Sequence, residues 1–383
     1  MGPIITIALL ALAVVCVATG FLPPPDTGAL IARIAPVLGF VVAITIVAEL
    51  GSEAGVFEAL AERMGRWGRG RVVALWASVI VLAVLSTAFL SLDTTAVLVT
   101  PVVVLLAQRV GISPIPFALA AVWLANTASL LLPVSNLTNL LATDRIGGGA
   151  GAFLALSWAP ALIGIAVPVV LLSILYRRSL TGSYTVAPVE PADDRVLLVV
   201  SAVVTVVLLP MLVITTEVWI PASIAAVVLL VLFAVRRRSV IRVGLIPWNA
   251  LGIALALFVL VETAHAHGLE DLLASVAGTG TGPLDLLRLA ALGALGANGI
   301  NNLPAYLVLE PQAAGDPLRL MALLIGVNLG PLVSPWASLA TLLWHDRVVS
   351  LGVTVRWGRF ALMGLLAVAI MIPLATVVLA LVH

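Results

Sequence analysis

The fold is decided by one stretch of sequence, residues 72–108, which reads VVALWASVIVLAVLSTAFLSLDTTAVLVTPVVVLLAQ. A helix needs only ~20 apolar residues to cross the hydrocarbon of a membrane, so this stretch is nearly long enough to do so twice. The polar cluster Ser91-Leu92-Asp93-Thr94-Thr95 interrupts it. Irregular backbone at membrane depth is tolerated only where it lines protein or water. The stretch therefore indicates either a broken membrane helix or the tip of a re-entrant hairpin.

A second stretch of the same kind covers residues 284–310, where Asn298-Gly299-Ile300-Asn301-Asn302 is followed by Pro304. Of the 383 residues, 62% are hydrophobic and only 10% are charged, against about a quarter charged in soluble domains. The composition therefore predicts an all-α polytopic membrane protein. Full crossings are expected at residues 4–19, 33–49, 117–144, 153–176, 196–215, 218–235, 248–265, 318–344 and 360–382. The first run is interpreted as a retained helix, because no basic segment precedes it.

Charge indicates how the chain is oriented. All 19 cationic residues are arginine, and with 18 acidic residues the net charge of +1 gives no support to a nucleic-acid partner. Counting crossings places all of the arginines on one face except Arg33, Arg145, Arg288 and Arg319. Arginine is enriched in cytoplasmic loops, so the count predicts a cytoplasmic N-terminus and an external C-terminus in the cytoplasmic (inner) membrane.

The two halves of the chain resemble each other. At a spacing of 213 residues, Glu49 and Gly55 match Glu262 and Gly268; at 202 residues, Asn126 matches Asn328. Residues 1–178 are predicted to form a first repeat, 179–216 a cytoplasmic loop and one connecting helix, and 217–383 a second repeat. An odd connector inverts the second unit, as in many secondary transporters.

Two further polar breaks fall at residues 133–139 and 334–341, each containing proline. Broken helices at matching places in two repeats indicate a transporter binding site, although Asn, Ser and Thr also join helices by hydrogen bonds worth ~0.6 kcal/mol. A carboxylate at membrane depth, such as Asp93, points to a proton carrier or a cation ligand. Glu49 and Glu262 are interpreted as scaffold or interface residues.

The sequence does not support a metal site, a cofactor site or an enzyme active site. His265 and His267 do not share a helix face, and Cys16 is the single cysteine, so no metal site and no cofactor are expected. The sequence contains no H-E-x-x-H, G-x-S-x-G or P-loop motif, so it is not expected to be an enzyme. Residues 51–68 mix apolar side chains with Glu and Arg, which is typical of a helix lying in the membrane interface.

The sequence resembles the ion transporter superfamily, and within it most closely the family of arsenical pump membrane proteins, the arsenite and antimonite efflux permeases. The resemblance is carried by FLSLDTTAV (residues 89–97), residues 126–141, INNLPA (residues 300–305), GVNLGP (residues 326–331) and SLATLLW (residues 338–344). It implies a scaffold and a mobile, elevator-like transport part, in which two re-entrant tips and two broken helices face one solute.

The resemblance further implies export of arsenite or antimonite by proton antiport, with Asp93 as the proton-coupling residue. The implied substrate-binding residues are Ser91, Thr94, Thr95, Asn126, Ser135, Asn136, Asn139, Asn298, Asn301, Asn302, Asn328, Ser338 and Thr341. The sequence departs from the family at Ser91 and Leu92, where two asparagines are usual. Alternatives are a sodium-coupled carboxylate or other anion carrier, and a membrane subunit or receptor that transports nothing. The sequence leaves open whether a cytosolic ATPase subunit binds the chain and whether the chain forms a homodimer.

Overall fold

The computed structural model describes residues 3–185 and 194–383; residues 1–2 of the predicted first repeat and 186–193 of the predicted loop lie outside the described residues. Within these ranges the regular structure is helical, apart from one isolated bridge between Arg71 and Ser183. The helices are α1 (Pro3–Ala18), α2 (Pro24–Glu53), α3 (Val56–Trp67), α4 (Val72–Leu90), α5 (Leu92–Thr94), α6 (Thr100–Arg109), α7 (Ile115–Thr127), α8 (Leu137–Ile146), α9 (Gly149–Leu175), α10 (Arg195–Ile214), α11 (Trp219–Arg236), α12 (Trp248–Ala266), α13 (Leu269–Ala277), α14 (Pro283–Ile300), α15 (Asn302–Ala313), α16 (Pro317–Leu329), α17 (Leu339–Ser350) and α18 (Trp357–Val382). In the described part, 8 helices are long and apolar enough to cross a membrane.

The structure contains the two-fold repeat that the sequence predicts. Helices α1–α9 recur in order as α11–α18, with α5 and α6 together matching α15, and α10 joins the two sets. Left-handed glycines precede α3 and α13, at Gly55 (φ 81°) and Gly268 (φ 92°). Of the three described non-glycine residues with positive φ, two occupy matching places after α4 and α14, Ser91 (φ 107°) and Asn301 (φ 112°). Matching backbone at matching positions supports duplication independently of the residue types.

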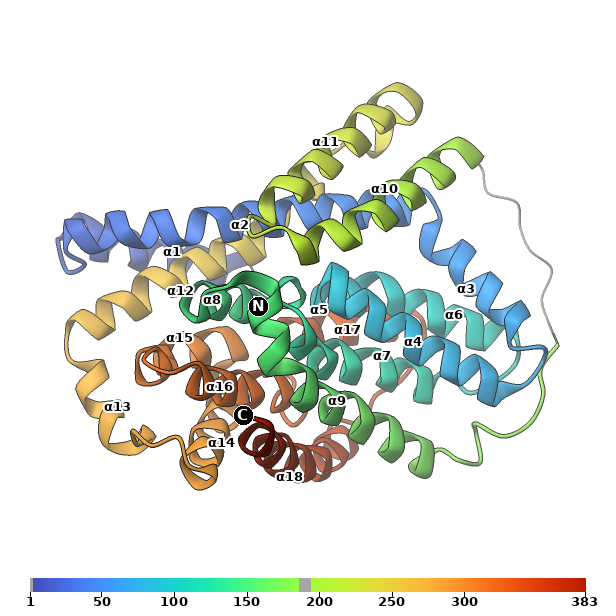
Figure 1. The fold of residues 1–383 in the computed structure, drawn as a ribbon. Coiled ribbons are helices and arrows are strands. Elements are labelled where there is room, and N and C mark those ends of the chain that lie inside the picture. Colours follow the sequence, from blue (N-terminus) through green and yellow to red (C-terminus); the bar gives the residue numbers. More distant parts are fainter. Residues whose placement is uncertain (1–2, 186–193) are drawn as a thin grey trace.

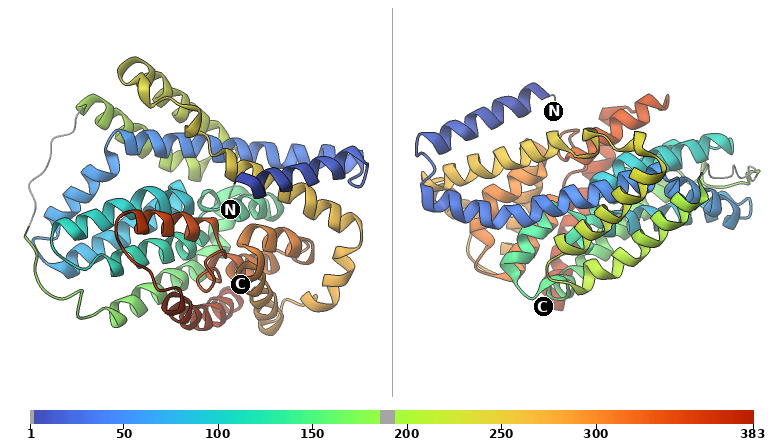
Figure 2. Two further views of the ribbon diagram at one scale, coloured as in Figure 1. Left: turned by 180° about the vertical axis from the view of Figure 1, so that it is seen from behind. Right: turned by 90° about the horizontal axis from the view of Figure 1, so that it is seen from above.

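One layer of the molecule is built from helices of both units. Helix α1 packs along α12, and α11 packs along α2, so each unit's first helix lies against the long helix of the other unit. In Figure 1 and in the left view of Figure 2, α1, α2, α10 and α11 lie along one edge of the molecule, above the hairpins and broken helices. This layer is the scaffold, and the hairpins and broken helices are the transport part.

The two interrupted stretches are re-entrant hairpins. Helix α3 contacts both α4 and α6, and α13 contacts both α14 and α15, so each hairpin returns to the end where it began. The second hairpin is also tied at its base, because the Arg319 guanidinium donates to the carbonyls of Gly278 (2.7 Å), Gly280 (2.6 Å) and Gln312 (3.0 Å). Length and composition alone would count the arms of the first hairpin, Val72–Leu90 and Leu92–Arg109, as two separate crossings.

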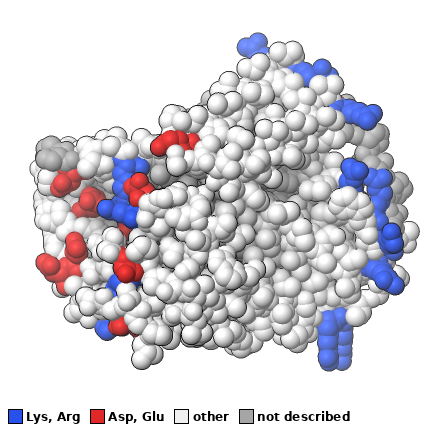
Figure 3. Space-filling model, in the orientation of Figure 1, with Lys and Arg blue, Asp and Glu red and all other residues white. Residues whose placement is uncertain are grey.

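Charged side chains gather at the two ends of the helix bundle. Figure 3 shows arginine alone at the right-hand end and a mixture of acidic and basic side chains at the left-hand end. Between them lies an uncharged surface, to which α10 and α11 contribute exposed side chains such as Val203, Val206 and Ile224. Such a band matches the hydrocarbon of a bilayer, with the ends in the polar regions. The chain is therefore a multi-pass membrane protein.

One helix differs clearly from its prediction. The crossing expected at residues 33–49 extends over Pro24–Glu53, and Arg33 lies inside it. A charge usually marks the end of an apolar span, but the Arg33 guanidinium forms an ion pair with Glu310 of α15. This pairing allows the helix to continue by more than two turns before Arg33.

Candidate functional site

The first hairpin tip is shaped by its own hydroxyl groups. Ser91 leaves the helical conformation, and its Oγ accepts a hydrogen bond from the Thr94 amide (3.3 Å). The Thr94 hydroxyl donates to the Leu90 carbonyl (2.9 Å), and the Thr95 hydroxyl donates to Ser86 Oγ (3.0 Å) and accepts from Thr87 (2.9 Å). A π-helical turn, Thr95–Val99, follows at once, a feature frequent at functional sites. The two threonines therefore hold the tip together and do not line the cavity described below.

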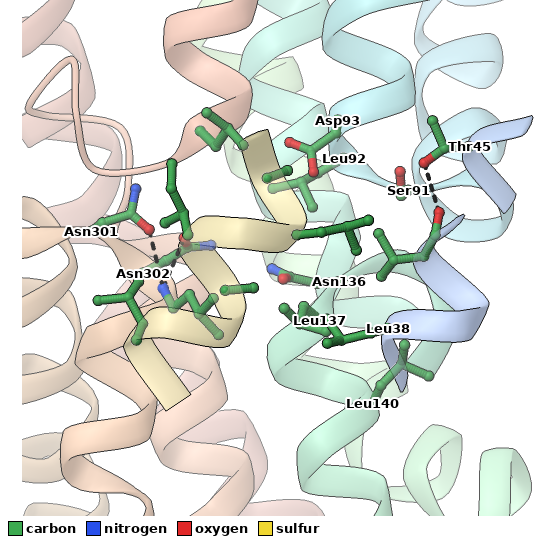
Figure 4. Close-up of a pocket in the computed structure, with 18 of the residues that line it drawn as sticks. Leu38, Thr45, Ser91, Leu92, Asp93, Asn136, Leu137, Leu140, Asn301 and Asn302 are labelled. Atoms are coloured by element: carbon green, nitrogen blue, oxygen red, sulfur yellow. Dashed lines mark hydrogen bonds between the residues drawn. The ribbon is translucent and has the colours of Figure 1, made fainter. Parts of the chain in front are cut away.

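Asp93 is the one residue of this tip with an unused polar group. Its Oδ1 is buried and has no hydrogen-bond partner among the described residues. A buried carboxylate oxygen without a partner is costly, so its presence needs an explanation in function. Figure 4 shows the Asp93 carboxylate beside Leu92, on the side of the cavity opposite Asn301 and Asn302.

The second tip clamps the break that precedes α17. The Asn298 amide donates to the Gly330 carbonyl (2.8 Å), and its Oδ1 accepts from the amides of Val333 (3.2 Å) and Ser334 (3.0 Å). The Asn301 amide donates to the Trp336 carbonyl (2.9 Å), and the Asn302 backbone N–H donates to the Ala337 carbonyl (2.9 Å). The second hairpin and the break before α17 are therefore joined by direct hydrogen bonds.

The first break is joined to the second repeat through Asn328 on α16. Asn136 donates to Asn328 Oδ1 (2.8 Å), and Asn328 donates in turn to Asn139 Oδ1 (2.7 Å). The Asn139 amide also satisfies the carbonyls of Ser129 (2.6 Å) and Leu132 (2.9 Å), which the helix break leaves free. The Ser135 hydroxyl donates to the Ala88 carbonyl (3.1 Å). These residues fix the shape of the break.

The reciprocal contact connects the first repeat to the second break. Ser338 begins α17, and its Oγ accepts from the Thr341 amide (3.2 Å). The Asn126 amide of α7 donates to the Thr341 hydroxyl (3.3 Å). The buried oxygens Asn126 Oδ1 and Thr127 Oγ1 have no partner in the described part of the chain. The two repeat-related asparagines, Asn126 and Asn328, thus each reach the break of the other unit.

A cavity of about 170 Å³ lies between the scaffold helices α1, α2 and α12 and the two tips. Five of the predicted residues line it, namely Ser91, Asp93, Asn136, Asn301 and Asn302. The others lie behind this lining, at Thr94, Thr95, Asn126, Ser135, Asn139, Asn298, Asn328, Ser338 and Thr341. These residues support the tips and breaks. Their direct contact with solute, which the resemblance implies, stays a prediction.

The remaining lining is mostly apolar and comes from the scaffold, including Phe40, Thr45 and Leu257. No sequence pattern marks these side chains, because they occupy ordinary apolar positions of membrane helices and face a hairpin that is distant in the sequence. Of the described residues that line the cavity, Asp93 alone carries a charged side chain. The cavity can therefore hold a small neutral or cationic solute with few polar contacts.

Sequence reasoning also missed a polar cluster at the mixed-charge end. The Glu310 carboxylate, on a residue only 4% exposed, pairs with Arg33, with Arg145 Nε (3.4 Å) and with the Tyr306 hydroxyl (3.2 Å). It lines a second cavity of about 310 Å³ together with Glu262 and His265. The three partners of Glu310 come from α2, α8 and α15. Arg33 and Glu310 are hundreds of residues apart in the sequence, so no local pattern links them.

Two inverted units, two hairpin tips and two broken helices around one cavity define a secondary transporter of the scaffold-and-transport type. Residues 2–316 match the model of the CitMHS family, described as "Citrate transporter", and the chain belongs to that family. The chain is therefore a membrane transporter within the ion transporter superfamily, and the resemblance inferred from its motifs is confirmed.

The sequence matches curated relatives over most of their length. The "Arsenical pump membrane protein" of Escherichia coli strain K12 is 29% identical, with 92% of this chain and 88% of that protein covered. A "Putative arsenical pump membrane protein" of Bacillus subtilis is 24% identical, with 80% and 78% covered. The crystal structure of the YdaH transporter of Alcanivorax borkumensis has the same fold, with a TM-score of 0.59, 16% identity and 98% and 96% of the two chains covered.

Proposed function

We propose that the chain exports arsenite or antimonite across the cytoplasmic membrane in exchange for protons, and that Asp93 carries the proton. One observation carries the proposal: Asp93 is the single charged side chain lining the cavity between the tips, and its buried Oδ1 has no partner among the described residues. A group in this position can gain a proton on one side of the membrane and lose it on the other.

The chemistry of the cavity suits arsenous acid, which is mostly neutral at pH 7. Amide and hydroxyl groups of Ser91, Asn136, Asn301 and Asn302 can accept and donate hydrogen bonds to its three hydroxyls. Tight capture by thiolates is not available, since Cys16 is the single cysteine and does not line the cavity. Weak oxygen contacts fit a carrier that must release its solute. The names of the relatives support the same solute class.

A second candidate is a sodium-coupled carboxylate carrier, because the matching family is described as a citrate transporter. In the part of the chain that the structure describes, no arginine or histidine lines the cavity to balance the charge of a di- or tricarboxylate. The starts of α8 and α15 lie at the cavity and could offer backbone amides to one carboxylate. Expression in an arsenite-sensitive cell separates the candidates: resistance supports arsenite export, whereas sodium-dependent citrate or succinate uptake supports the carboxylate carrier.

The proton role is tested by Asp93→Asn in proteoliposomes. The amide keeps the shape of the side chain but cannot titrate, so arsenite accumulation driven by a pH gradient should be lost, while exchange between equal pools continues. Glu49→Gln is the control, since Glu49 does not line the cavity. An Asp93→Asn protein that still pumps arsenite against its gradient would refute the proton role. Loss of both activities in proportion to folded protein would make Asp93 structural.

The same preparation addresses the open partners. Transport by the purified chain alone would show that a cytosolic ATPase subunit is not required, and light scattering in detergent measures whether the chain forms a homodimer. The proposal also keeps the orientation given by the arginines, with the N-terminus in the cytoplasm and the C-terminus outside.

A further inference from the structure

A long apolar groove separates the scaffold from the first hairpin at the arginine-rich end of the molecule. It has a volume of about 800 Å³, within the range of small-molecule sites, and its walls are α2, α3, α4 and α10. In Figure 1, α2 and α10 lie above α4, and α3 lies at the right. Among the described residues, none lines both the groove and the solute cavity, so the groove is a separate site.

The walls of the groove include apolar side chains that are exposed. Val81 and Leu85 on α4 and Val203 and Val206 on α10 are each at least 50% exposed in the isolated chain. An empty space of this size between apolar walls would forfeit the dispersion contacts that its lining atoms could make. In a bilayer the molecules available to fill it are lipid chains.

One end of the groove carries a fixed positive charge. Arg63 lines the groove on α3, and its guanidinium lies over the Trp67 ring, 5.7 Å from the centroid. No acidic side chain of the described ranges lines the groove, and Glu58 and Glu62 of the same helix lie outside its walls. Helix α3 is amphipathic and belongs to the interface, and Trp67 is the residue type that sits at headgroup depth. The positive end of the groove therefore lies where a lipid phosphate would be.

We propose that the groove binds one anionic phospholipid, with an acyl chain between α2, α4 and α10 and its phosphate at Arg63. The deep end of the groove reaches Ser86 and Phe89, one turn before the first hairpin tip. The bound chain thus contacts both the scaffold and the arm of the transport part. The site depends on the membrane fold alone and not on which solute is carried.

Headgroup recognition is tested by native mass spectrometry of the full chain, delipidated in detergent. The probes are phosphatidylglycerol, phosphatidylcholine with the same acyl chains, and glycerol 3-phosphate, which has no chain. Phosphatidylglycerol should bind at one per chain and more tightly than phosphatidylcholine, and glycerol 3-phosphate should not be retained. Arg63→Gln should lower the affinity for phosphatidylglycerol about fivefold, the effect of one cation at a lipid surface. Arg66→Gln, on the same helix but outside the groove, is the matched control.

Occupancy of the groove is tested by filling it from opposite walls. Gly51 on α2 has open space where a side chain would start, and Ala77 on α4 is exposed in the groove. Gly51→Leu and Ala77→Phe should each reduce retention of both phospholipids, whereas Val73→Phe, one turn away and outside the groove, should not. Size-exclusion chromatography shows which of the two groove-filling variants remains folded. One folded variant is enough for the test.

Three results would overturn the proposal. Equal affinities for the two phospholipids, unchanged by Arg63→Gln, would show that the site does not recognise an anionic headgroup. Unchanged lipid retention in a folded, groove-filled variant would show that the acyl chain does not bind in the groove. Conversion of a dimer to a monomer by the filled variants, with lipid retention unchanged, would make the groove an interface between two copies of the chain.

Discussion

The ion pair between Arg33 and Glu310 allows a quantitative test of how the scaffold is joined to the second hairpin. Arg33 belongs to α2 and Glu310 to α15, and their side chains are 18% and 6% exposed. Glu310→Gln keeps the size of the side chain and removes its charge, leaving the Arg33 guanidinium with only Asp144 as a counter-charge, at 4.0 Å and on a side chain that is 70% exposed. Arg33 Nε already has no hydrogen-bond partner among the described residues, so few compensating contacts exist.

The magnitude follows from burial. Breaking a fully buried pair costs ~3–5 kcal/mol, and because Arg33 retains some exposure we expect about 2–3 kcal/mol for Glu310→Gln. Arg145 also approaches Glu310, at 3.4 Å, but its side chain is 48% exposed. Pairs of that kind contribute ~0–1 kcal/mol, so Arg145→Gln should have a small effect.

The assay is reversible unfolding of the purified protein in mixed micelles, as a double-mutant cycle. Arg33→Gln and Glu310→Gln are measured singly and together, and the Arg145–Glu310 cycle is the control. The Arg33–Glu310 coupling should exceed ~1 kcal/mol and the Arg145–Glu310 coupling should fall below it. Additive effects of Arg33→Gln and Glu310→Gln, or equal losses for Glu310→Gln and Arg145→Gln, would refute the reasoning.

Three further expectations concern other parts of the chain. Asn328→Ala removes the link between the repeats and leaves buried amides of the first break unpaired, so it should cost about 1–3 kcal/mol and more than Asn302→Ala, measured by the same unfolding assay. Hydrogen bonds from Arg236 and from the first amides of α10 hold the pKa of Asp194 below its usual range, so this cap should persist at neutral pH and be lost only as pH falls below about 3.9, seen as faster amide exchange at the start of α10. Labels on the two termini should react from opposite sides of the membrane, and labelling from one side only would contradict the inverted repeat.

The sequence located the hairpin tips correctly because polar residues within apolar stretches leave few structural options. Ser91 and Asn301 adopt matching left-handed backbone conformations, at the places where the polar clusters had been recognised. Whether the stretches cross twice or return was not decided by the sequence. That depends on where the arms end, and the contacts of α3 and α13 with both arms answered it.

The site was predicted only in outline. Asn126 and Asn328 lie near the ends of α7 and α16, and the other predicted residues lie at the tips and breaks. The Asn139 amide satisfies backbone carbonyls and the Asn328 amide donates to Asn139, whereas Asn136 and Asn302 reach the cavity. Residue type cannot separate these cases, because an asparagine that supports a broken helix and one that faces a solute look the same in sequence.

By itself the sequence determined the membrane class, the repeat, the positions of the breaks and the arginine-rich end. Each of these follows from local hydropathy, from spacing or from charge, which are properties of residues near one another in the chain or of their order. Only the tertiary structure decided the re-entrant path of the hairpins, the five residues that line the cavity, the Arg33–Glu310 pair and the groove beside Arg63. These depend on contacts between segments far apart in sequence, where an apolar residue on α2 and a polar tip residue meet only because both units fold against the same scaffold.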